Sequence, residues 1–172
     1  MTRMPYAEAL AQAGVMDALA AFDPHVAGTP PLGIDLPSSD IDILCEAPDL
    51  AAFTAHLRHS FGAMSQFMLL ERRDLDAVIA RFTGHGWPFE IFGQAIPVAP
   101  QHGWRHFEVE RRLLALGGDA LREQVMAWRR SGLKTEPAFA AALKLPGDPY
   151  AAMLDLGKRD DATLLALIRS RE

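Results

Sequence analysis

The sequence lacks the features of several large protein classes. It has one cysteine, Cys45, which excludes a disulfide framework and a zinc site built from several cysteines. No apolar run approaches the roughly 18 residues of a membrane span, and the N-terminus has no apolar core of a secretory signal. With 17 basic residues against 22 acidic ones, the chain has no basic excess for a long nucleic acid. We therefore expect a soluble cytoplasmic protein without a membrane partner.

The composition is that of a folded chain. The 172 residues are 49% hydrophobic and 23% charged, which excludes a disordered protein. A chain of this length buries roughly 70% of its surface on folding, so its core needs no disulfide or structural metal.

Hydrophobic periodicity predicts an α+β protein. Helical spacing covers residues 5–21 and 50–61, and strands are expected at 25–28, 40–46, 63–70, 77–82 and 87–92, the last two joined by a loop over 83–86. Beyond Pro97 the segments 104–116, 121–130, 137–143 and 150–169 all have helical patterns. We predict an α/β core over residues 1–97 and a C-terminal helical region over 98–172 packed on it, as two parts or as one single domain.

Two aspartates form the sharpest feature. Asp40 and Asp42 flank Ile41 in a predicted strand, so both carboxylates project to one face while Ile41 and Ile43 enter the core. Carboxylates this close repel each other unless solvent or a cation lies between them. Oxygen ligands of this kind suit Mg²⁺ or Mn²⁺.

Two further elements extend this candidate site. Gly28-Thr29 stands ten residues before Asp40, and a glycine followed by a hydroxyl can approach a phosphate closely. Glu90 lies among large apolar residues on a predicted strand, where a charge needs a partner or a function. A structural ion pair with Arg81 or Arg105 is the alternative for Glu90.

These residues resemble the nucleotidyltransferase-fold superfamily. Its pattern is a Gly-Ser or Gly-Thr turn, then Asp-x-Asp on a strand, then a third acidic residue on a neighbouring strand of a mixed sheet with flanking helices. The resemblance implies that Asp40, Asp42 and Glu90 are catalytic and bind Mg²⁺ or Mn²⁺, with Glu90 readying the acceptor hydroxyl. It also implies that Gly28, Thr29 and Ser39 contact the phosphates of a nucleoside triphosphate.

More narrowly, the chain resembles a bacterial family described as domain of unknown function 4269. The similar segments are GTPPLGID (28–35), SDIDI (39–43), FEIFGQ (89–94), KTEPAF (134–139) and GDPY (147–150). They cover most of the chain, and they imply a fold more directly than an activity.

Two basic residues in the helical region are further candidates for binding phosphate. Arg105 lies near a predicted helix start, where anions are attracted, and the neighbouring His106 has the same position. Lys134 precedes Thr135-Glu136-Pro137, which is also a helix-start pattern with Thr135 or Glu136 as the cap, so a purely structural role is the alternative. We expect His56, His59, His102 and His106 to be surface or capping residues, with a place on the substrate side as the alternative for His106.

Three functional hypotheses follow. The first is a metal-dependent nucleotidyltransferase that transfers a nucleoside monophosphate to a small-molecule or protein acceptor. The second is a non-catalytic nucleotide- or anion-binding protein of the same fold, favoured by Pro30 and Pro31, which lack N–H groups for a phosphate. The third is a partner protein of the toxin–antitoxin type.

Overall fold

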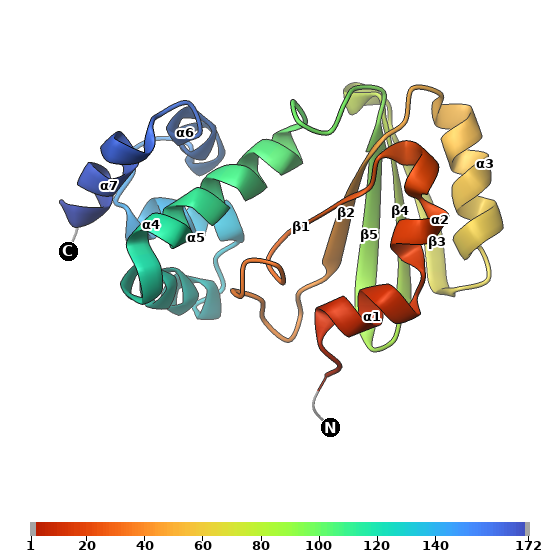
Figure 1. The fold of residues 1–172 in the computed structure, drawn as a ribbon, viewed down its shortest axis with the longest axis horizontal. Coiled ribbons are helices and arrows are strands. Elements are labelled where there is room, and N and C mark those ends of the chain that lie inside the picture. Colours follow the sequence, from red (N-terminus) through yellow and green to blue (C-terminus); the bar gives the residue numbers. More distant parts are fainter. Residues whose placement is uncertain (1–2, 171–172) are drawn as a thin grey trace. The chain divides into compact units, whose positions relative to one another are not determined.

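The computed structural model describes residues 3–170 and divides them into two compact units (Figure 1). The first unit contains residues 3–31 and 38–101, and the second contains Leu32–Pro37 and residues 102–170. The first unit holds the whole sheet, and the second is helical outside Leu32–Pro37. The change from α/β to α character thus lies between Gln101 and His102.

The first unit is built on a mixed sheet of five strands in the order β1-β2-β5-β4-β3. The strands are β1 (His25–Ala27), β2 (Ile41–Glu46), β3 (Ser65–Arg72), β4 (Ala77–Gly84) and β5 (Trp87–Gln94). Only β2 and β5 are parallel to each other, and the other neighbours are antiparallel. This arrangement confirms the predicted α+β class with a mixed sheet.

The turn between β4 and β5 is shorter than the predicted loop over 83–86. Both strands continue to Gly84 and Trp87, which pair with each other, so only His85 and Gly86 form the turn. Their φ angles are +51° and +78°, as a two-residue hairpin turn requires.

Three helices of the first unit contribute to its core. They are α1 (Tyr6–Gln12), α2 (Val15–Ala18) and α3 (Leu50–Phe61), with short 3-10 turns η1 (Ala20–Phe22) and η2 (Arg73–Leu75). The continuous helix predicted over residues 5–21 is wrong, because Gly14 adopts φ +62° and ends α1. Helix α3 matches its prediction and is capped by the Asp49 carboxylate, which accepts hydrogen bonds from two backbone amides.

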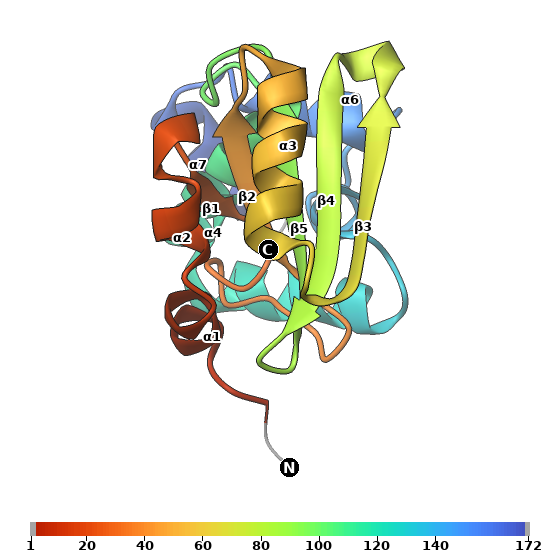
Figure 2. The same cartoon turned by 90° about the vertical axis from the view of Figure 1, so that its right-hand side faces the viewer.

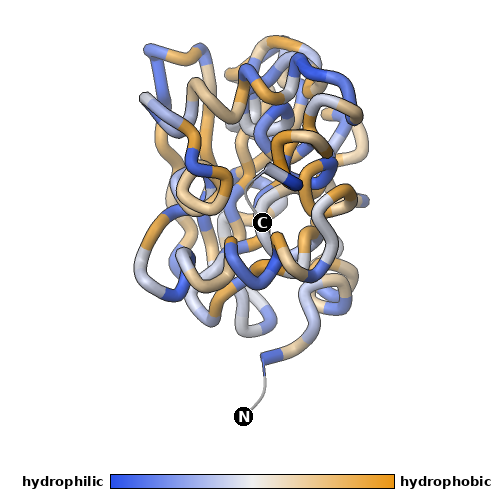
Figure 3. Tube along the Cα trace, turned by 90° about the vertical axis from the view of Figure 1, so that its left-hand side faces the viewer, coloured by the Kyte–Doolittle hydropathy of each residue, from blue (hydrophilic) through white to orange (hydrophobic). Residues whose placement is uncertain are grey.

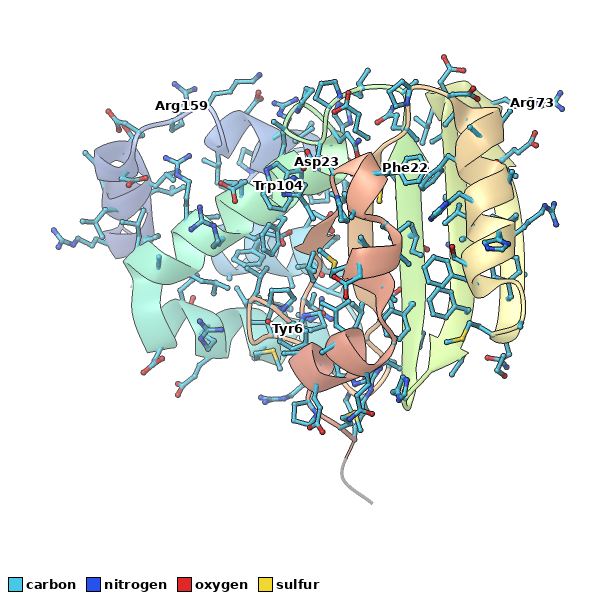
Figure 4. The ribbon with its side chains drawn as sticks, turned by 45° about the vertical axis from the view of Figure 1, so that its right-hand side comes forward. Tyr6, Phe22, Asp23, Arg73, Trp104 and Arg159 are labelled. Carbon is cyan, nitrogen blue, oxygen red and sulfur yellow. The ribbon has the colours of Figure 1, made fainter. Side chains whose placement is uncertain are left out.

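The core lies between these helices and one face of the sheet (Figure 2). Alternate residues of the central strands enter it, among them Ile41 and Ile43 of β2 and Phe89 and Ile91 of β5. Phe22, which is labelled in Figure 4, packs against this core, and its ring lies edge-on to Phe53 with centroids 4.8 Å apart. The residues that alternate with Ile41, Ile43, Phe89 and Ile91 along β2 and β5 project from the opposite face of the sheet.

Cys45 is fully buried in the core, as expected for a small apolar residue. Burial raises the pKa of its thiol to about 12, and the negative charge of Asp23 acts in the same direction. We expect the native protein not to react with Ellman's reagent at pH 8, since the thiolate is the reactive form. Urea-unfolded protein should release one equivalent of thionitrobenzoate, and rapid reaction of the native protein would contradict this burial.

The second unit consists of α4 (His102–Arg130), α5 (Thr135–Ala142), α6 (Pro149–Leu156) and α7 (Asp161–Arg169). Helix α4 is interrupted at Gly118, whose φ of +57° and ψ of −151° are not helical, so the predicted break at Gly117-Gly118 is present. The single helix predicted over 150–169 is wrong. Gly157 ends α6, and the Asp160 carboxylate starts α7 by accepting a hydrogen bond from the Thr163 amide.

Within residues 3–170, none of the helices combines the length and the apolar character needed to cross a membrane. Hydrophilic and hydrophobic positions alternate in short stretches along the trace (Figure 3).

Candidate functional site

Two of the predicted carboxylates lie side by side on the sheet. Asp42 of β2 and Glu90 of β5 are paired positions in the parallel ladder, so their side chains leave the same face. This is the face opposite the core, and both residues are partly exposed. Neighbouring strands are about 4.8 Å apart, which brings the two carboxylates within reach of one ion. The sheet therefore assembles the centre of the predicted site.

Asp40 is placed differently from the prediction. The strand begins at Ile41, so Asp40 stands in the loop that leads into β2 instead of within the strand. The chain here has no ladder partner to fix the direction of the side chain. Asp40 still lies two residues before Asp42, at the same end of the strand.

Gly28 makes room for the Asp42 carboxylate. Ala27 at the end of β1 pairs with Asp42, and the chain then turns at Gly28 with φ +76°. A Cβ atom at Gly28 would lie 2.1 Å from Oδ2 of Asp42, which is far inside van der Waals contact. The absence of a side chain at Gly28 thus leaves space for the Asp42 carboxylate, whereas its predicted approach to a phosphate stays a prediction.

Thr29 and Ser39 also lie together. The Thr29 hydroxyl donates a hydrogen bond to the Ser39 hydroxyl over 3.1 Å, although ten residues separate them in sequence. Ser39 is buried, with 7% of its surface exposed. The two predicted phosphate ligands therefore form one pair at the entrance to β2.

Arg3 reaches the same segment and was missed by the sequence analysis. Its Nη2 donates to the Ser39 carbonyl over 2.6 Å, and its Nε donates to the Gly86 carbonyl over 3.2 Å. The guanidinium lies 3.2 Å from the centroid of the Trp87 ring. The hydrogen-bond partners of Arg3 are up to 83 residues away in sequence, so no local pattern could have indicated them.

Glu90 is held by a cation on its other side. Arg81 of β4 is paired with Glu90 in the ladder, and its Nε and Nη2 each lie 2.7 Å from Oε2 of Glu90. The structural ion pair that the sequence left open is therefore made with Arg81. Along this row of the sheet, Glu90 stands between Arg81 and Asp42.

The other two predicted phosphate ligands belong to the second unit. Arg105 lies in the first turn of α4, and Lys134 is the N-cap residue of α5. The expectation that Thr135 or Glu136 caps this helix is wrong, because the helix begins at Thr135. Pro137 in the first turn costs nothing, since amides there have no helical partner.

His106 of α4 is buried, which contradicts the expected surface role. It is 9% exposed, its ring lies edge-on to Tyr150 with centroids 6.2 Å apart, and its Nδ1 has no hydrogen-bond partner among the described residues. Burial lowers the pKa of His106, and the positive charges of His102 and Arg105 act in the same direction. Glu136 and Asp148 oppose this shift.

We expect the unfolding free energy to fall as the pH drops below 6.5, the ordinary pKa of histidine. Below pH 6.5 the unfolded chain binds a proton at this histidine more readily than the folded state does. The contribution of neutral His106 to the unfolding free energy is therefore fully present above pH 6.5 and is lost as the pH falls through the lower pKa of the folded state. His106→Phe should flatten this dependence in urea unfolding between pH 5 and 8. His59→Gln, at an exposed position of α3, is the control and should keep the wild-type slope. If the unfolding free energy of His106→Phe depends on pH as strongly as that of wild type, His106 is not the group responsible.

The donor set fits a hard divalent cation in its chemistry. Asp42 and Glu90 offer carboxylate oxygens from one row of the sheet, and Asp40 adds a third carboxylate nearby in the chain. Over residues 3–170, no three His, Cys, Asp or Glu side chains are already arranged to hold a metal ion. Glu90 is not arranged for a metal ion because its carboxylate accepts a hydrogen bond from Arg81.

Solved structures define the class of this fold. The chain is similar to the RNA terminal uridylyl transferase Cid1, with a TM-score of 0.58 and 12% identity over 86% of this chain and 46% of Cid1. For a Cid1 poly(U) polymerase structure with bound MgGTP the TM-score is 0.59 and the sequence identity is 13%, over 87% of this chain and 47% of Cid1. For the structure of the GLD-2/RNP-8 complex the TM-score is 0.60 and the sequence identity is 9%, over 96% of this chain and 75% of the matched chain. The chain thus has the nucleotidyltransferase fold and spans about half the length of Cid1.

The family is shown by the sequence itself. Residues 8–156 match the family described as "Domain of unknown function (DUF4269)", and the chain belongs to it. Among curated proteins, none matches the chain.

Proposed function

We propose that this protein is a metal-dependent nucleotidyltransferase that transfers a nucleoside monophosphate from a nucleoside triphosphate to a small-molecule or protein acceptor. The observation that carries the proposal is the pairing of Asp42 with Glu90 on adjacent parallel strands, with Gly28 packed against Asp42. The fold neighbours include a polymerase with bound MgGTP, which supports a role for magnesium and nucleotide. The chain itself has no excess of basic residues, which favours a small or protein acceptor over a long nucleic acid.

Asp40, Asp42 and Glu90 would hold the metal in this proposal. Bound Mg²⁺ or Mn²⁺ would supply charge neutralisation and alignment for in-line attack at the α-phosphate. The Thr29 and Ser39 hydroxyls would exchange their mutual hydrogen bond for bonds to phosphate oxygens, and Gly28 keeps the backbone close to Asp42 without a side chain in between. Glu90 would orient the acceptor hydroxyl. Arg105 and Lys134 belong to the second unit and stay separate candidates for binding phosphate.

A second candidate is a nucleotide- or anion-binding protein of the same fold that does not turn over. The ion pair between Arg81 and Glu90 favours it, because that pair neutralises the third carboxylate without a metal ion. The two candidates differ in whether nucleotide binding requires a divalent cation.

A thermal-shift panel separates the two candidates. The four nucleoside triphosphates are each tested with and without Mn²⁺, on wild type and on Asp42→Asn. A ligand that binds only the native state raises Tm, by about 5 °C or more when its concentration is a hundred times Kd. The transferase predicts a shift that needs nucleotide and metal together and is lost in Asp42→Asn. A shift without metal supports the binding protein, and a flat panel contradicts both.

A further inference from the structure

Arg81 and the divalent cation require the same group. Both donor nitrogens of the guanidinium that face Glu90 lie 2.7 Å from Oε2. Such charge-assisted contacts are stronger than neutral hydrogen bonds, and because both are made to Oε2 they hold the Glu90 carboxylate towards Arg81. The pair is accessible, since the side chains of Arg81 and Glu90 are 52% and 26% exposed.

The geometry of the row makes the two arrangements alternatives. Glu90 has Arg81 on one neighbouring strand and Asp42 on the other, each at a directly paired position. A short rotation of the Glu90 side chain would carry its carboxylate from the arginine towards the aspartate. A cation beside Asp42 also repels the guanidinium of Arg81, which lies one strand beyond Glu90 in the same row. Binding of a metal by Glu90 is therefore coupled to release of Arg81.

We propose that Arg81 is a positioning residue that competes with the divalent cation for Glu90 and so lowers the affinity of the empty site for metal. This proposal rests on the proposed function, because it concerns the same carboxylates. It assigns Arg81 a role beyond the superfamily pattern, which consists of the glycine turn and the acidic residues. The site then becomes fully competent only when Glu90 has exchanged its partner.

The test measures Mn²⁺ affinity by electron paramagnetic resonance, which requires no turnover. Arg81→Gln removes the charge and both contacts to Glu90. Arg81→Lys keeps the charge and loses the two-nitrogen contact. Arg72→Gln is the matched control, because Arg72 is on β3 at 42% exposure and pairs with Asp74 instead. Its loss changes the net charge equally without touching Glu90, and a thermal melt of each variant checks the fold.

The background of Glu90→Gln separates competition from the mere loss of a charge. Long-range repulsion, screened by salt, acts whether or not Glu90 carries a carboxylate. We expect Arg81→Gln to raise Mn²⁺ affinity about thirtyfold in the wild-type background and about threefold in Glu90→Gln. Arg81→Lys should give an intermediate increase, and Arg72→Gln should bind like wild type.

Two results would overturn the proposal. One is an equal increase for Arg81→Gln in both backgrounds, which would reduce Arg81 to a distant charge. The other is unchanged affinity in Arg81→Gln when Asp42→Asn shows that the site exists. If neither wild type nor Arg81→Gln binds Mn²⁺, the metal site of the proposed function fails together with this inference.

Discussion

Asp42→Asn should abolish the binding of Mn²⁺ while the protein remains folded. Asn keeps the shape of the side chain, so the contact with Gly28 and the strand pairing of β2 are preserved. It loses the negative charge and one ligand oxygen. Even the outer partners of metal ligands change affinity about 10- to 100-fold, so loss of a direct ligand should cost about a hundredfold or more. Isothermal titration with MnCl₂ measures the effect, and circular dichroism checks the fold.

Glu46→Gln is the matched control for this experiment. Glu46 is a carboxylate on the same strand, and it leaves the same face two alternations beyond Asp42. At about 3.3 Å per residue it lies too far along β2 to share the ion. Asp40→Asn should weaken binding as well, since the proposal makes Asp40 a ligand. Equal Mn²⁺ affinity in Asp42→Asn, Glu46→Gln and wild type would show that the metal site is assigned wrongly.

Gly28→Ala should lower Mn²⁺ affinity about tenfold or more, with only a modest loss of stability. The new Cβ would meet Oδ2 of Asp42 at 2.1 Å, and the flexible carboxylate is the group that can move. Displacing it removes a ligand from its position, and a ligand that is misplaced costs affinity even when it is present. The positive φ of +76° adds about 1–2 kcal/mol to the cost for an L-residue.

Gly86→Ala isolates the backbone cost. Gly86 has φ +78°, and a Cβ there meets nothing within 4 Å. The two variants should therefore lose similar unfolding free energy, within about 1 kcal/mol in urea denaturation. Only Gly28→Ala should lose metal affinity. If both variants bind Mn²⁺ like wild type, Gly28 has no role in placing the carboxylate.

The sequence was informative wherever a local pattern determines the outcome. Alternation in 40–46 correctly separated Ile41 and Ile43, which enter the core cluster, from Asp42, which is partly exposed. The predicted approach of Gly28 to a phosphate stays a prediction, and the group that lies against Gly28 in the structure is the Asp42 carboxylate. A local pattern could not place Asp42 beside Glu90, because a long stretch of the first unit separates β2 from β5 in sequence. Only the resemblance to the superfamily implied that pairing.

The errors have specific physical causes. A four-residue loop between β4 and β5 would have placed Ile79 opposite Glu90, whereas the two-residue turn places Arg81 there. Because the predicted turn length was wrong, the sequence could not show that Arg81 is the ion-pair partner of Glu90 instead of Arg105. Helical periodicity also continues through Gly14, where the backbone leaves the helical region. Periodicity reports which side chains face the core, and it does not report the backbone angles at a glycine.

In the proposed function, Asp42 and Glu90 hold a divalent metal ion while a nucleoside triphosphate is bound. Anomalous scattering from a crystal soaked with Mn²⁺ and a nonhydrolysable nucleoside triphosphate would locate that ion. We expect a manganese peak about 2.1 Å from carboxylate oxygens of both residues, with Arg81 turned away from Glu90. No peak at this row of the sheet, with Arg81 still bound to Glu90 and the nucleotide present, would contradict it.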